Sequence, residues 1–202
     1  MLFVKYEGKT GLMNTADFVL ASEEKFSRLL KENGIADFAQ ACGFIRALPY
    51  RRNSEKTDPA IIFRENCGTC STKHAALKIL ADENKIPGIK LMLGIYRMNR
   101  QNTPGIGDTL EKHGIEFLPE AHNYLRVNGE ILDCTGLNSA AASFSPSLLQ
   151  EIEITPAQIG DFKVNFHQSF IREWLQQINS EFTFEQTWQI REDCIRALAK
   201  NN

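Results

Sequence analysis

One cysteine in this sequence stands where a thiol becomes reactive. Cys70 lies in residues 66–77, NCGTCSTKHAAL, where a glycine turn opens into a segment with apolar residues at helical spacing. A cysteine at the start of a helix faces unpaired backbone N–H groups and the positive end of the helix dipole. Both favour the thiolate, which is the nucleophilic form of cysteine. We therefore expect Cys70 to be a nucleophile if a base lies within reach.

A second segment is predicted to form a β-hairpin. Residues 122–135 flank Asn128-Gly129, the strongest short signal for a two-residue type I′ turn. Both turn positions need positive φ, which asparagine and glycine tolerate. A two-residue turn fixes the register, and the expected pairs are Val127 with Glu130, Leu125 with Leu132, and Tyr124 with Asp133.

This register places a histidine and an aspartate on the same face of the hairpin. Side chains alternate between the two faces of a strand, so His122 and Asp133 become diagonal neighbours. Diagonal Cβ separations are roughly 7–8 Å or less, within reach of an imidazole–carboxylate hydrogen bond. A slip of one residue would put the two side chains on opposite faces. The sequence thus predicts a His122–Asp133 pair and, with Cys70, a Cys-His-Asp triad.

The three residues together favour acyl-transfer chemistry. A helix N-terminus and an adjacent imidazolium lower a cysteine pKa into roughly the 3.5–7.5 range. Asp133 would fix the tautomer of His122 and stabilise its cation. The backbone N–H of Cys70 would donate to a developing oxyanion, and Asn66 is assigned as a second donor from its proximity in the sequence alone. We expect attack on an amide, ester or thioester through an acyl-enzyme.

Two other functions remain open. Cys67 and Cys70 form a C-x-x-C at a helix start, a pattern also typical of thioredoxin-like dithiol oxidoreductases. That hypothesis gives His122 and Asp133 no role, and no clear long strand leads into the motif. The third hypothesis is a non-catalytic binding module. His74, one helical turn after Cys70, is better interpreted as an exposed or locally bonded histidine than as a catalytic one.

The sequence carries no pattern for a cofactor or a metal. It has no second C-x-x-C and no paired histidines at ligand spacing, so we expect no zinc site. Among the five cysteines, Cys42, Cys134 and Cys194 lie in apolar surroundings and are interpreted as core residues.

Composition narrows the class of protein. A chain of 202 residues with 43% hydrophobic and 24% charged residues fits one soluble globular domain, residues 1–202. The net charge of −2 creates no field that would recruit nucleic acid or a membrane surface. No apolar run approaches the 18 residues of a membrane helix. Residues 1–9 lack a signal-peptide layout because Lys5 and Glu7 interrupt the apolar stretch. We expect a cytoplasmic protein, where disulfides are rare.

Hydrophobic periodicity indicates the elements that must position the triad. Apolar residues recur at helical spacing in five segments, and their ends carry helix-terminating residues such as Gly34 and Pro49. The expected helices cover residues 22–34, 36–48, 71–84, 167–178 and 184–200.

Between these helices the pattern changes to that of strands and loops. Branched and aromatic residues predict a strand over Ile89–Met98. Residues 99–119 are expected to form a long loop with a helical turn at 108–113, while residues 139–156 are poorly patterned. The fold class is therefore α+β: a helix carrying the nucleophile packs on a small antiparallel sheet, with further helices at both ends. The C-terminal helices form an appendage over about residues 160–202.

Three segments resemble a known family. The sequence Leu-Pro-Tyr at residues 48–50, GTCSTKHA at residues 68–75, and the His122–Asp133 hairpin are similar to the transglutaminase-like superfamily, which has a papain-like core. The resemblance covers about residues 36–136. It implies that Cys70 is the nucleophile, His122 the base and Asp133 the orienting acid. Because that superfamily includes peptidases, amidases, acyltransferases and non-catalytic members, it implies a peptide, protein or small amide or ester substrate without choosing among them.

Overall fold

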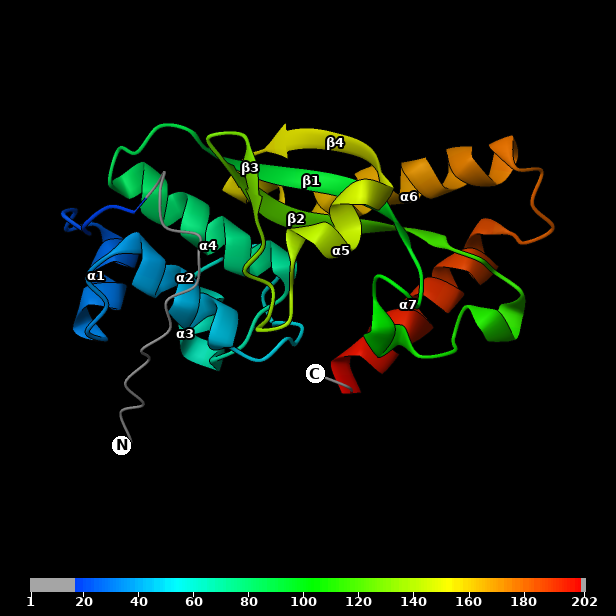
Figure 1. Cartoon of the computed structure of the whole chain (residues 1–202), viewed down its shortest axis with the longest axis horizontal. Coiled ribbons are helices and arrows are strands. Elements are labelled where there is room, and N and C mark those ends of the chain that lie inside the picture. Colours follow the sequence, from blue (N-terminus) through cyan, green and yellow to red (C-terminus); the bar gives the residue numbers. More distant parts are fainter. Residues whose placement is uncertain (1–16, 201–202) are drawn as a thin grey trace.

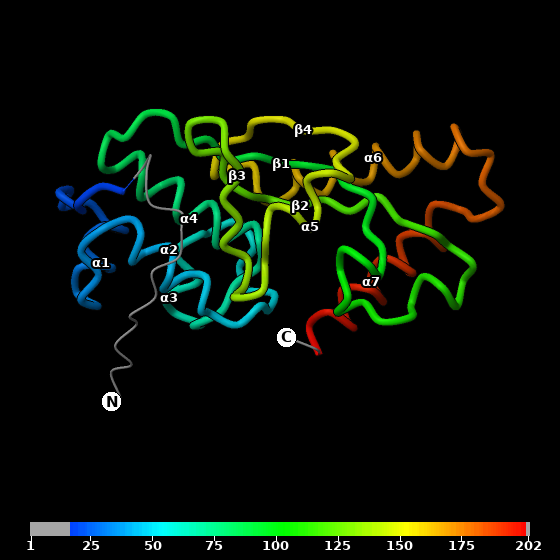
Figure 2. The backbone as a smooth tube through the Cα atoms, in the orientation of Figure 1, coloured from blue at the N-terminus to red at the C-terminus, as the bar shows by residue number. Residues whose placement is uncertain are grey.

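The computed structural model describes residues 17–200 and has a mixed α+β architecture, as predicted. Four antiparallel strands form one sheet in the order β3-β2-β1-β4. Helices α1 to α4 lie toward one end of the molecule, and α6 and α7 lie toward the other, as Figure 1 and the tube in Figure 2 show. The prediction on a signal peptide concerns residues 1–9, which lie outside the described residues.

The hairpin that carries the predicted histidine forms with the predicted register. It consists of β2 (Leu118–Val127) and the short β3 (Glu130–Leu132). Asn128 and Gly129 connect them with φ values of 50° and 94°, the left-handed backbone that a type I′ turn needs. β2 begins before residue 122, so part of the expected loop 99–119 is strand. The cross-strand pairs are Val127–Glu130, Arg126–Ile131 and Leu125–Leu132.

The centre of the sheet is β1 (Ile89–Met98), whose bounds are the predicted ones. It pairs with β2 on one side and with β4 (Leu148–Ile154) on the other. The sequence analysis missed β4 and left residues 139–156 without an element. This was wrong because β4 is an edge strand whose side chains are mostly exposed or half-buried, and apolar and polar residues alternate only in the second half of its sequence, LLQEIEI, so the hydrophobic signal is weak.

The helix with the candidate nucleophile is held by shorter helices around it. α4 (Cys70–Glu83) lies against β1 and β2, and most of its residues are buried. The helix predicted from residue 22 starts later, because the Ser22 hydroxyl accepts a hydrogen bond from the Glu24 backbone before the helix begins. The shorter helices are α1 (Lys25–Glu32), α2 (Phe38–Ala47) and α3 (Ile61–Glu65).

Two long helices follow β4. α7 (Phe184–Lys200) has the predicted bounds, but α6 (Asp161–Gln177) starts well before residue 167. Phe162 and Val164 in its first turns are exposed, so the apolar stripe that identifies the helix begins only later in the sequence. None of the described helices is long and apolar enough to cross a membrane. The remaining elements are α5 (Ala141–Phe144) and 3₁₀ turns at Pro104–Ile106, Glu111–His113, Ser145–Ser147 and Pro156–Gln158.

The sheet is covered on both faces. Alternate residues of β1 enter two clusters of buried apolar side chains, with Leu91 and Leu93 in one and Met92 and Tyr96 in the other. The first cluster joins the sheet to α1, α2, α3 and α4, and the second joins it to α5, α6 and α7. The strands are thereby fixed in space, and the side chains that they carry are held with them.

Candidate functional site

Cys70 is the first residue of α4, as predicted from its glycine turn. The side chain of Thr72 accepts a hydrogen bond from the backbone N–H of Thr69 at 3.1 Å and ties the turn to the helix start. Only glycine fits at position 68, because a Cβ there would lie 2.9 Å from Oγ1 of Thr72 and 3.0 Å from a methyl group of Ile62. The backbone N–H of Cys70 belongs to the first helical turn, where such groups have no partner within the helix.

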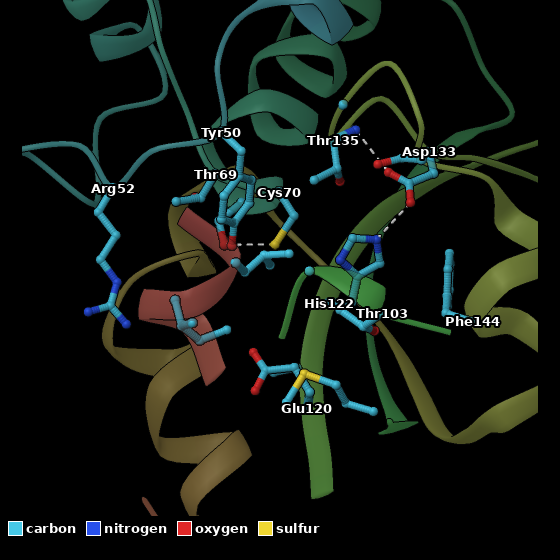
Figure 3. A pocket seen from close by; sticks show the side chains of 18 of the residues that line it. Tyr50, Arg52, Thr69, Cys70, Thr103, Glu120, His122, Asp133, Thr135 and Phe144 are labelled. Atoms are coloured by element: carbon cyan, nitrogen blue, oxygen red, sulfur yellow. Dashed lines mark hydrogen bonds and ion pairs between the residues drawn. The ribbon is translucent and has the colours of Figure 1, made fainter. Parts of the chain in front are cut away.

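The predicted pair of His122 and Asp133 is present. Nε2 of His122, on β2, lies 3.0 Å from Oδ2 of Asp133, which follows β3. Figure 3 shows the second ring nitrogen of His122 turned toward Cys70. This nitrogen can therefore exchange a proton with the thiol of Cys70.

All three residues line one cavity of about 1010 Å³. The start of α4 and β2 form one part of its wall, and the loops around residues 46–56 and 133–139 form another. The C-terminal helices α6 and α7 complete the wall. The aromatic side chains that line it are Tyr50, Tyr96, Phe144 and Trp188.

The electrostatics favour an ion pair between the thiol and the imidazole. Burial raises the pKa of Cys70, but the Lys163 ammonium and the hydrogen bond and charge of His122 together lower it well below its usual value. Burial lowers the pKa of His122, while the charge and hydrogen bond of Asp133 and the contact with Cys70 raise it to about 10. Both shifts favour a thiolate–imidazolium ion pair over the neutral thiol and imidazole.

Asp133 is anchored as well as charged. Its Oδ1 accepts a hydrogen bond from the backbone N–H of Thr135 at 2.9 Å, and the side chain is almost fully buried. Burial raises the pKa of this carboxyl, but the charge of His122 and its hydrogen bond hold that pKa well below the usual range. The carboxylate is thus ionised and fixed in the position that orients His122.

His74 is a buried structural residue, in line with the interpretation of a locally bonded side chain. Its Nε2 accepts the backbone N–H of Cys134 at 2.7 Å, so its Nδ1 carries the proton and donates to the carbonyl of Cys70 at 2.8 Å. It joins the start of α4 to the loop behind Asp133 and does not line the cavity.

Two residues near Cys70 in the sequence are not brought to the site. Asn66 ends α3 with a left-handed backbone, is exposed and does not line the cavity, so its assignment as an oxyanion donor was wrong. Cys67 is buried outside the cavity, and its sulfur accepts hydrogen bonds from Arg51 at 3.4 Å and Asn53 at 3.7 Å. Within residues 17–200 every cysteine is a free thiol.

The sequence analysis missed Lys163. Its Nζ lies 3.5 Å from the sulfur of Cys70 and 2.8 Å from the hydroxyl of Ser71. No local pattern links a lysine on a late helix to a cysteine far earlier in the chain, and the predicted helix began only after it. Its position depends on how α6 packs, which the sequence does not show.

Glu120 was also missed, although a signal for it existed. It stands two residues before His122 on β2, and strand alternation puts both on one face. The carboxylate is buried and accepts hydrogen bonds from Arg191 of α7 at 2.6 and 2.8 Å. Burial raises the pKa of Glu120, but the charge of Arg191, then of His167, lowers it to about 2. The guanidinium also bonds Glu192, and this chain of charges fixes α7 to the cavity wall.

The described residues contain no group of three or more His, Cys, Asp or Glu side chains placed to hold a metal ion.

Comparisons with known proteins identify no family for this chain. No family model matches the chain, and searches of curated proteins and of solved structures gave no match.

Proposed function

We propose that this protein is a cysteine-nucleophile acyl-transfer enzyme, a hydrolase or acyltransferase, that uses Cys70, His122 and Asp133. The observation that carries the proposal is their arrangement: a thiol at a helix start and an imidazole held 3.0 Å from a buried carboxylate line the same cavity. The roles follow as nucleophile, base and orienting acid.

The reaction would begin at the sulfur of Cys70. The thiolate attacks the carbonyl carbon, a C–S bond forms, and the π electrons move to the oxygen as an oxyanion. The C=O bond re-forms as the bond to the leaving group breaks, and the leaving group takes the proton of the His122 imidazolium. An acceptor with an O–H, N–H or S–H bond then gives its proton to His122 and attacks the thioester, which restores the thiolate.

The proposed substrates are peptides, proteins or small amides or esters, and the proposed family is the transglutaminase-like superfamily. A cavity of about 1010 Å³ lined by aromatic and polar side chains is large enough for a peptide segment or a small acyl donor. The helix–sheet–hairpin order of Cys70, His122 and Asp133 agrees with that family. We also propose a cytoplasmic location, which the free thiols support.

Acylation by a neutral ester tests the proposal. We expect p-nitrophenyl acetate to release a burst of nitrophenol and to leave an acetyl group on Cys70, located by mass spectrometry. Cys70→Ala should abolish both, whereas Cys194→Ala, which removes a buried cysteine outside the cavity, should keep them. A wild-type chain that takes up iodoacetamide at Cys70 but is never acylated would contradict the proposal and favour a binding module.

The same assay separates the dithiol hypothesis. Cys67→Ser should leave acylation unchanged, because Cys67 does not line the cavity. Disulfide-reductase activity that is lost in Cys67→Ser would support the oxidoreductase in its place.

A further inference from the structure

Lys163 holds an unusual position for a lysine on a late helix. Its ammonium lies 3.5 Å from the sulfur of Cys70 and 2.8 Å from Oγ of Ser71, and the side chain is half-buried in the cavity wall. Among residues 17–200 no carboxylate lies within ion-pair distance of this ammonium. The negative group closest to it is therefore the thiolate, and the Glu120 carboxylate, whose pKa the charge of Lys163 also lowers, lies farther away.

The charges of the site balance only while a negative charge stays near Lys163. At rest, the Cys70 thiolate and the Asp133 carboxylate offset the His122 imidazolium and the Lys163 ammonium. When the thiolate attacks a carbonyl carbon, its charge passes to the carbonyl oxygen, which is bonded to the carbon that the sulfur has just joined. An ammonium 3.5 Å from the sulfur can donate to this oxyanion when the carbonyl oxygen is turned toward α6.

We propose that Lys163 is a further catalytic residue. Its ammonium stabilises the negative charge first on the sulfur of Cys70 and then on the substrate oxygen, where it binds the oxyanion together with the backbone N–H of Cys70. Lys163 thus has the role of second oxyanion donor that was predicted for Asn66. The leaving group takes its proton from His122, so this role requires no proton transfer from Lys163. This inference rests on the proposed acyl-transfer function.

Two reagents distinguish an oxyanion donor from a residue that only stabilises the thiolate. Alkylation by iodoacetamide is a displacement at a saturated carbon and forms no oxyanion, whereas acylation by p-nitrophenyl acetate forms one. We would measure both rate constants against pH for Lys163→Met, Lys163→Arg and Lys90→Met, which removes an exposed lysine far from the cavity.

In Lys163→Met we expect the acylation rate constant of the thiolate form to fall by about 10²- to 10³-fold, the usual cost of one oxyanion donor. The alkylation rate constant of the same form should change by only a few-fold, which also shows that the site is folded. Lys163→Arg should keep more of the acylation rate than Lys163→Met, and Lys90→Met should match the wild type.

Other outcomes overturn the inference. Equal losses of alkylation and acylation, explained by a higher pKa of Cys70, would limit Lys163 to stabilising the thiolate. A loss confined to an ester with a carboxylate, such as mono-p-nitrophenyl succinate, would make it a site for anionic substrates. If the wild type is acylated and Lys163→Met equally so, this inference alone fails. If the wild type is not acylated at all, the proposed function fails with it.

Discussion

Substitution of Asp133 by asparagine tests how the site holds its ion pair. Two unit charges 3.0 Å apart attract by about 5 kcal/mol at an effective dielectric constant of about 20, which equals about four pKa units. Burial of His122 opposes this attraction, and the pKa of the imidazole still reaches about 10. Without the carboxylate charge, burial is opposed by Cys70 alone, and the pKa of His122 should fall well below about 10.

The effect on Cys70 follows from the loss of the imidazolium. Asp133→Asn leaves Lys163 as the cation beside the thiol, so the pKa of Cys70 should rise. Each unit by which that pKa exceeds the assay pH reduces the thiolate fraction about tenfold. The asparagine amide at position 133 also disfavours the His122 tautomer that can accept a proton from the thiol of Cys70. Loss of the orienting acid in a triad lowers kcat by up to about 10⁴-fold.

Iodoacetamide alkylation between pH 4 and pH 10 measures the change. Because Lys163 and His122 lower the pKa of Cys70 well below its usual value, the wild type should react faster at pH 6 than an ordinary thiol, and Asp133→Asn should react at least about tenfold more slowly than the wild type there. Asp82→Asn is the matched control, because it removes one negative charge from the exposed side of the same helix as Cys70. Equal rates for Asp133→Asn and the wild type at pH 6 would refute the argument that His122 and Asp133 control the thiol.

Three further substitutions, with Gly43→Ala as a control, test the elements that hold the site, each by urea unfolding. The pKa of Glu120 is lowered from 4.5 to about 2, so its carboxylate contributes about 3 kcal/mol to the free energy of unfolding above pH 4.5, and this contribution is lost as the pH falls to about 2. Glu120→Gln should remove this contribution at pH 7 and flatten the pH dependence of unfolding between pH 4.5 and 2. Gly68→Ala displaces the Thr72 hydroxyl from the helix cap and should cost at least about 1 kcal/mol and slow alkylation. Gly94→Ala places a Cβ 2.8 Å from the half-buried Leu148 of β4 and 2.9 Å from the buried Tyr124 of β2, and it should cost about 1–3 kcal/mol. Gly43→Ala, in open space on α2, should stabilise by about 0.5–1 kcal/mol, and the same sign for both would contradict the packing described.

The sequence was most informative where one local signal determines a geometry. Asn128-Gly129 allows only a few turn types, and the turn then determines the register that brings His122 to Asp133. The bounds of β1 were equally predictable, because a short apolar run rich in branched and aromatic residues favours a buried strand over a helix.

The failures share a different physical cause. β4 is an edge strand, so its position depends on β1 as a partner rather than on its own apolar pattern. Lys163 reaches Cys70 only through the packing of α6, and nothing in its local sequence indicates that contact. The choice of Asn66 used nearness in the sequence as a substitute for nearness in space, but the left-handed turn at the end of α3 keeps this residue at the exposed surface.

The position of Lys163 on α6 also sets the order in which the site is completed during synthesis. Cys70, His122 and Asp133 all precede α6 in the chain, so they leave the ribosome before the ammonium that neutralises the thiolate. Because Lys163 lowers the pKa of Cys70 and α6 forms part of the cavity wall, the thiol should have a higher pKa and lower reactivity until α6 packs against the sheet. We therefore expect Cys70 to be weakly reactive on the growing chain and to become fully reactive only after α6 has packed against the sheet.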